Sequence, residues 1–145
     1  MAGLGIRLAA GDKLVVNGAA IQFETDARIT FVNHVNFLFG RQILAPDEAV
    51  TPARRIYFAL QTAYVGTPEE RDQALKSAEY FIAAFAAETT STHARALLME
   101  ALHAAREGRG YDALRYARRI IRHEDAVLGP KIEVDPSVRT VFGVK

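Results

Sequence analysis

The sequence of 145 residues contains no cysteine. This absence excludes disulfide bonds, a thiol nucleophile and any metal or iron–sulfur site that depends on thiolate ligands, and it fits a reducing cytoplasm. No apolar run is long enough to span a bilayer. The first residues also lack the basic and apolar segments of a secretory signal. We therefore expect a cytoplasmic protein that does not bind membranes.

A strong excess of charge of either sign is also missing. The 18 Lys and Arg residues nearly balance the 17 Asp and Glu residues, which leaves a net charge of +1. The protein as a whole is therefore not a basic nucleic-acid binder, and any electrostatic site must come from the distribution of its charges. The hydrophobic share of 50% and the length fit one ordinary globular domain.

The chain lacks the recognisable sequence motifs of catalysis. It has no phosphate-binding loop of the GxGxxG or GxxxxGK[ST] type and no GxSxG nucleophile elbow. Its four histidines have no metal-like spacing and no paired carboxylate motif, so we interpret each as a solvated or capping residue: His34, His93, His103 and His123. The sequence therefore predicts neither an enzyme nor a site for a metal or cofactor.

Residues 1–45 are predicted to form an antiparallel β meander. Asn17-Gly18 separates two short apolar runs and suits a type I′ turn, in which both central residues have positive φ. Further strands are expected at 28–32 and 37–39. Such a small sheet needs a helix or a partner on its apolar face. Its uncovered edges also predict pairing between subunits, and therefore a homo-oligomer.

Residues 46–129 are predicted to form a bundle of about four helices. Thr51 and Pro52 provide an N-cap and a first-turn proline for one helix, and Thr67 opens a capping box for the next. Apolar residues then recur with helical spacing, and short turns between the segments favour antiparallel packing. With a flexible tail at 130–145, we predict one compact domain of the α+β class.

The predicted last helix carries four arginines at positions i, i+3, i+4 and i+7, on one face: Arg115, Arg118, Arg119 and Arg122. Guanidinium groups hold phosphates bidentately and stack on unpaired bases, so this face is a candidate RNA-binding surface. Arg54 and Arg55 on the first helix add two candidate positive charges. The alternative is a solvated face of an amphipathic helix that binds nothing.

Glu124 projects from the middle of the apolar face of the same helix. An unpaired carboxylate buried there is costly, so we expect an arginine partner, with Arg54 or Arg55 as candidates. The alternative is a frayed helix end that exposes Glu124 to solvent.

A set of aromatic residues is interpreted as core, with base stacking as the alternative: Phe31, Phe37, Phe39, Tyr57, Phe58 and Tyr64.

Three blocks of the sequence resemble the FlbT family. The segment 51–58, TPARRIYF, resembles the family's TPAR-x-IYF signature, and residues 11–19 resemble its N-terminal G-[ED]-K…NGA pattern. Residues 111–129 resemble its final helix. Arg54 and Arg118 match motif positions, as do six further residues, which we interpret as a structural motif: Asn17, Gly18, Pro52, Tyr57, Glu124 and Asp125.

This resemblance implies a bacterial regulator of flagellin synthesis without enzymatic activity or cofactor. Members of the family act after transcription: they associate with the 5′ untranslated region of flagellin messenger RNA and repress, or in some members promote, its translation. The resemblance also implies work alongside flagellin and the small flagellar protein FlaF. The alternative is a protein-binding adaptor or chaperone for either of these. A shorter likeness to the CsrA family of RNA-binding repressors, in 45–48 and 54–57, would place RNA on the strands instead.

Overall fold

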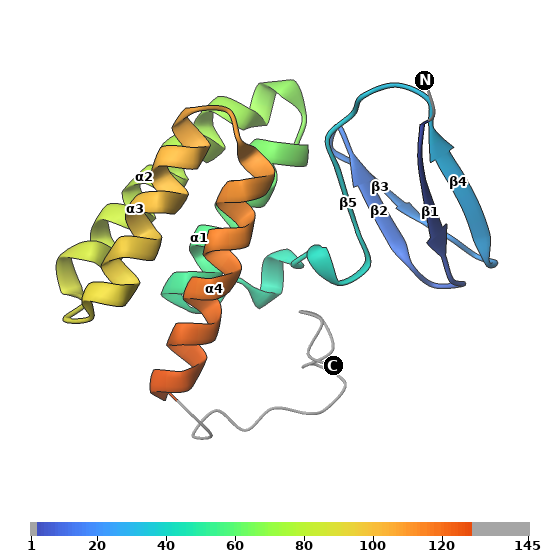
Figure 1. Ribbon diagram of the computed structural model, residues 1–145. Helices are drawn as coiled ribbons and strands as arrows, with labels where there is room; N and C mark the ends of the chain where they lie inside the picture. Colours follow the sequence, from blue (N-terminus) through green and yellow to red (C-terminus); the bar gives the residue numbers. More distant parts are fainter. Residues whose placement is uncertain (1–2, 129–145) are drawn as a thin grey trace.

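The computed structural model describes residues 3–128, and its strands and helices are arranged in layers (Figure 1). The strands are β1 (Leu4–Leu8), β2 (Lys13–Val16), β3 (Ala19–Gln22), β4 (Ala27–Phe31) and β5 (Phe37–Phe39). Two short 3-10 helices follow at Gly40–Gln42 and Pro46–Glu48. The helices are α1 (Pro52–Val65), α2 (Pro68–Glu88), α3 (Thr92–Arg106) and α4 (Gly110–Leu128). The predicted α+β class and the bundle of four helices are confirmed.

Strands β1 to β4 form one long hairpin that is bent in the middle. At its tip, Asn17 and Gly18 have φ angles of 50° and 80°, as a type I′ turn requires. In the β2–β3 ladder and in the β1–β4 ladder, the sequence positions of two paired residues always sum to 35, as for Lys13 with Gln22 and Leu8 with Ala27. The register is therefore continuous, although the bend splits the hairpin into two sheets.

The order of pairing departs from a simple meander. The strands are antiparallel as predicted, but β5 pairs with β2 and not with β4, and the sheets have the orders β1-β4 and β3-β2-β5. The bend that splits the hairpin into two sheets has a local cause. Gly11 has a φ angle of 90°, and the carboxylates of Asp12 and Asp26 accept the backbone N–H groups of Ala9 and Ala10 at 2.8 and 2.9 Å.

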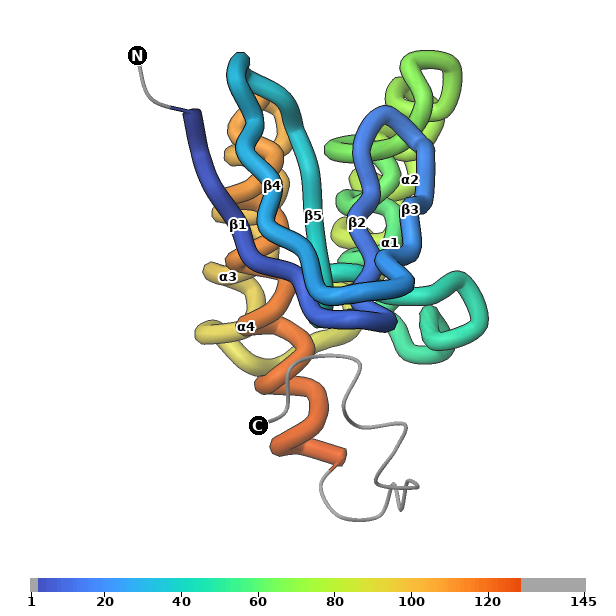
Figure 2. The backbone as a smooth tube through the Cα atoms, turned by 90° about the vertical axis from the view of Figure 1, so that its right-hand side faces the viewer, coloured from blue at the N-terminus to red at the C-terminus, as the bar shows by residue number. Residues whose placement is uncertain are grey.

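The sheet β3-β2-β5 lies between the helices and the outer sheet β1-β4. Figure 2 shows β1 beside β4, with β5, β2 and β3 following across the view. Leu38 of β5 is fully buried in the helical core, whereas Leu8 and Leu14 are buried outside that core cluster. The rings of Phe31 and Phe37 connect β4 to β5, with centroids 4.3 Å apart. These contacts give the strands a small apolar core of their own.

Each helix of the bundle packs against two others: α1 contacts α2 and α4, and α3 contacts α4 and α2. The fully buried side chains of the helical core include Ile56, Ile82, Leu98, Leu114 and Ile120. Local caps fix the helix starts, as predicted for α1, where the Thr51 hydroxyl accepts the N–H of Arg54 at 3.2 Å.

The hairpin tip is attached to the junction between α1 and α2. The N–H of Gly18 donates to the carbonyl of Val65 at 2.6 Å, and the guanidinium of Arg71 donates to the Asn17 side chain at 2.8 Å. A Cβ atom on Gly18 would lie 2.4 Å from the Thr67 methyl group, so only glycine fits this approach. The Asn17-Gly18 pair therefore makes the turn and also docks the sheet on the bundle.

Strand β3 leaves its outer edge exposed, and all four of its residues are accessible. Pairing between subunits through such an edge stays a prediction, as does the division at residue 45. The predicted tail, 130–145, lies outside the described residues. Between residues 3 and 128, no helix has the length and the apolar composition needed to cross a membrane.

Candidate nucleic-acid interface

Helix α4 separates its residues into a buried apolar face and an exposed cationic face. Its buried side includes Leu114, Ile120 and Ile121. Arg115, Arg119 and Arg122 are exposed, whereas the fourth arginine of the predicted face, Arg118, is half-buried. The structure therefore brings three of the four predicted arginines to the solvent face and turns the fourth towards α1.

Arg118 is engaged by Tyr57, which is fully buried on α1. Its Nη2 atom donates to the Tyr57 hydroxyl at 3.3 Å, and its guanidinium carbon lies 6.0 Å from the ring centroid. The hydroxyl itself donates to the carbonyl of Gln42 at 2.6 Å. Burial raises the pKa of Tyr57, and the hydrogen bond and charge of Arg118 act in the opposite direction. Arg118 therefore holds α4 against α1.

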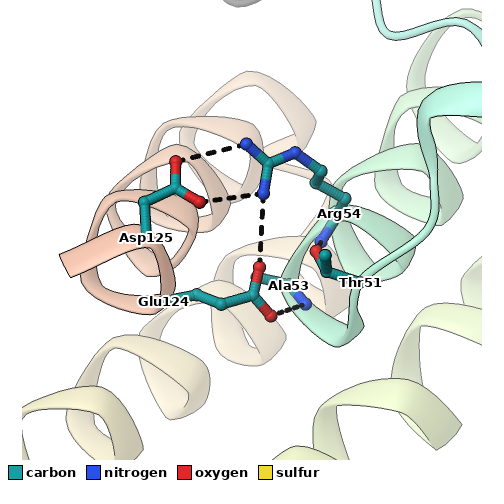
Figure 3. A network of polar contacts seen from close by, with 5 residues as sticks. All are labelled: Thr51, Ala53, Arg54, Glu124 and Asp125. Carbon is teal, nitrogen blue, oxygen red and sulfur yellow. Dashed lines mark hydrogen bonds and ion pairs between the residues drawn. The ribbon is translucent and has the colours of Figure 1, made fainter. Parts of the chain in front are cut away.

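The start of α1 is attached to the end of α4 by two carboxylates (Figure 3). The side chain of Glu124 accepts the N–H of Ala53 at 3.0 Å and contacts Nη1 of Arg54 at 3.4 Å. Asp125 accepts both terminal nitrogens of Arg54, at 3.0 and 3.2 Å, which is bidentate geometry. We call Arg54, Glu124 and Asp125 the acid–arginine cluster.

This cluster decides between the two alternatives for Glu124. The residue is only 6% exposed and α4 continues to Leu128, so the alternative of a frayed, solvated end is wrong. Of the two candidate partners, Arg54 forms the ion pair, while Arg55 is exposed and forms no salt bridge within residues 3–128. The Glu124 carboxylate also lies at the positive end of α1, where a negative charge is stabilised by the helix dipole.

The remaining arginines of α4 have few partners. Arg115 lies 3.5 Å from the carboxylate of Asp112, one turn earlier. Neither Arg119 nor Arg122 forms an ion pair within the part of the chain that the structure describes. We call Arg115, Arg119 and Arg122 the α4 arginine stripe. It is a positively charged surface in which only Arg115 has a carboxylate partner among the described residues.

Three of the six aromatic side chains interpreted as core pack in or against the helical core, namely Tyr57, Phe58 and Tyr64. Tyr57 is fully buried, and Phe31, Phe37, Phe39, Phe58 and Tyr64 are half-buried. Among the histidines, His103 pairs with Glu107 at 2.8 Å, and His93 lies near His123, with ring centroids 6.1 Å apart. No group of three potential metal ligands occurs within residues 3–128.

The sequence matches a known family over almost the whole described region. The family described as Flagellar protein FlbT matches residues 4–128. The chain belongs to the FlbT family. This match includes the strands, the four helices and every residue of the acid–arginine cluster.

Proteins of the same family from other bacteria are similar along most of their length. A protein of Chelativorans sp. (strain BNC1) is 32% identical over 123 residues, which cover 85% of this chain and 84% of the relative. A protein of Rhizobium leguminosarum bv. trifolii (strain WSM2304) is 31% identical over 129 residues, covering 86% and 83%. Both carry the name probable flagellum biosynthesis repressor protein FlbT. No solved structure matches the chain significantly.

In this FlbT chain, the segment from Thr51 to Phe58 has structural tasks. Thr51 caps α1, the N–H of Ala53 binds Glu124, Arg54 binds both carboxylates, and Tyr57 binds the carbonyl of Gln42. These contacts position α1 against α4 and against the 3-10 helix Gly40–Gln42. The acidic pair Glu124 and Asp125, near the end of the last helix, was the sequence signal that could have identified Arg54 as a structural arginine.

Proposed function

We propose that this chain regulates flagellin synthesis in the cytoplasm by binding the 5′ untranslated region of flagellin messenger RNA. The α4 arginine stripe carries the proposal, because three exposed guanidinium groups on one helix face match the repeating charge of an RNA backbone. The relatives are named probable flagellum biosynthesis repressor proteins, and we propose repression, exerted on translation, as the direction of regulation here. Such a regulator binds RNA and needs no catalytic residue.

The six arginines suggested by the sequence have three different roles in this proposal. Arg115, Arg119 and Arg122 contact phosphates. Arg54 and Arg118 act indirectly, since their side chains hold α4 in place through Glu124, Asp125 and Tyr57. Arg55 is exposed at the rim of a groove between α1 and α2 and is assigned no phosphate. Loss of Arg54 should therefore weaken binding only to the extent that the fold loosens.

The test is the affinity for labelled flagellin leader RNA at several salt concentrations. Arg119→Gln combined with Arg122→Gln removes two phosphate contacts, each of which changes the slope of log K against log salt by about 0.7. We expect this slope to become shallower by about 1.4, with roughly 15-fold weaker binding at about 0.15 M salt. A control, Lys76→Gln with Arg106→Gln, lowers the net charge equally at exposed positions on α2 and α3, and it also breaks the surface ion pair of Arg106 with Glu79 at 2.9 Å.

Two results would refute this assignment. The first is wild-type binding that is absent or does not depend on salt. The second is an equal loss of affinity in the Arg119/Arg122 variant and in the control, because net charge alone would then explain the binding. Circular dichroism should give the same helix content for all variants, since the four substituted side chains lie outside the core.

An adaptor for flagellin or FlaF is the second candidate function. The observation in its favour is an apolar groove between α1 and α2, lined by Phe58, Ala59, Ala74 and Phe81, with Arg55 at the rim. An amphipathic helix of the partner would place its apolar face there. A stoichiometric complex with either protein that is lost on Phe81→Glu, together with no RNA binding, would favour this function over the first.

A further inference from the structure

The outer face of the sheet β1-β4 carries two arginines that lie directly opposite each other. Arg7 of β1 and Arg28 of β4 are paired in the antiparallel register, and both are exposed. The next pair on the same face is Gly5 with Thr30, which is also exposed. The alternate residues point to the other face and are buried or partly buried there, as Leu8 is, except for Leu4 at the start of β1, which is exposed. The two guanidiniums therefore share a solvent-facing surface.

Neither arginine forms an ion pair with a carboxylate of the described residues. Within residues 3–128, no salt bridge or side-chain hydrogen bond involves Arg7 or Arg28. Asp26, which directly precedes β4, uses its carboxylate to accept the N–H of Ala10 at 2.9 Å. Like charges that face each other across an antiparallel ladder destabilise it. The free protein therefore maintains a repulsive pair that a bound anion would relieve.

The chemistry of this face fits a phosphodiester. Two neighbouring guanidiniums bind the oxygens of one phosphate or of two successive phosphates, and the exposed Thr30 hydroxyl adds a further donor. Gly5 has no side chain, and a Cβ atom placed there would only reach van der Waals contact with the Thr30 hydroxyl and the Ile29 carbonyl, both at 3.7 Å. A sugar–phosphate backbone can therefore lie flat along the strands beside Thr30.

We infer that Arg7 and Arg28 form a second phosphate-binding surface for the RNA that the α4 arginine stripe binds. This inference rests on the proposed function. The sheet β1-β4 is the layer farthest from the helices (Figure 1), so the two surfaces are separate contacts along one strand of RNA. An acidic protein segment is the competing ligand, and the test distinguishes it from RNA.

The experiment measures leader-RNA affinity and thermal stability for wild type and for Arg7→Gln combined with Arg28→Gln. Loss of two phosphate contacts should weaken binding roughly 15-fold at about 0.15 M salt and roughly 65-fold at about 0.05 M. The midpoint of thermal unfolding should stay the same or rise, because the substitution removes the cross-strand repulsion. A purely structural role for the arginines would lower the midpoint. The control is again Lys76→Gln with Arg106→Gln.

The outcomes separate this inference from the proposed function. If wild type fails to bind RNA, both are overturned. If wild type binds and the Arg119/Arg122 variant is weakened, but the Arg7/Arg28 variant equals wild type or the control, only the second surface is overturned. Loss of a complex with an acidic protein, with RNA affinity unchanged, overturns it as well. Weaker RNA binding beyond the control, at unchanged or higher stability, supports it.

Discussion

Replacing Arg54 by methionine should destabilise the fold strongly, because it leaves the buried Glu124 carboxylate with the N–H of Ala53 as its only remaining hydrogen bond that the structure records. Breaking a buried ion pair by removing one partner costs about 3–5 kcal/mol. The Arg54 side chain is 21% exposed and Asp125 is 49% exposed, so water recovers part of this loss. We therefore expect a loss of about 2–3 kcal/mol, which lowers the unfolding midpoint by roughly 5–10 °C in a chain of this size.

Urea denaturation followed by circular dichroism measures this change, and a double-mutant cycle isolates its cause. Arg55→Met is the matched control; Arg55 is exposed and unpaired within residues 3–128, so its change should stay within about 0.5 kcal/mol. Glu124→Met should cost about 1–3 kcal/mol, since the buried N–H of Ala53 loses its acceptor. The double variant should cost less than the sum, with a coupling of about 1–2 kcal/mol. A loss below about 0.5 kcal/mol for Arg54→Met, or strict additivity, refutes the reasoning.

The remaining predictions concern the hairpin tip and the buried tyrosine. Gly18→Ala should lower the free energy of unfolding by about 2–3 kcal/mol, since it adds a clash with Thr67 to the strain of a positive φ. Gly11→Ala should lower it by only the strain of about 1–2 kcal/mol, because a Cβ atom there meets nothing within 4 Å. Equal losses in the two variants would contradict the docking of the hairpin tip on the bundle. Tyr57→Phe should cost about 1–2 kcal/mol through the unpaired Gln42 carbonyl. Because burial raises the pKa of Tyr57 above 10.0, the unfolded chain ionises first, and stability held below about pH 10 is lost as the pH rises further. Tyr57→Phe should reduce this loss of stability at alkaline pH. An unchanged dependence of the unfolding free energy on pH would contradict the assignment to Tyr57.

The sequence alone determined the local structure. Caps at Thr51 and Thr67 and the helical spacing of apolar residues defined the helices, whose observed bounds follow those signals closely. Asn17-Gly18 defined the turn of the hairpin because few residue pairs adopt two positive φ angles. These features depend on the conformational preferences of a few neighbouring residues, so they can be read without knowing the fold.

Only the tertiary structure decided which charges are used and which remain exposed. Arg54 and Arg55 are adjacent in the sequence, yet only Arg54 reaches the carboxylates on α4, because successive helical residues point about 100° apart. Arg118 shares the spacing of its exposed neighbours but lies at the edge of the stripe, where Tyr57 engages it. The pairing of Arg7 with Arg28 needs the long hairpin register. Contacts between distant segments set these roles, and spacing along one element does not encode them.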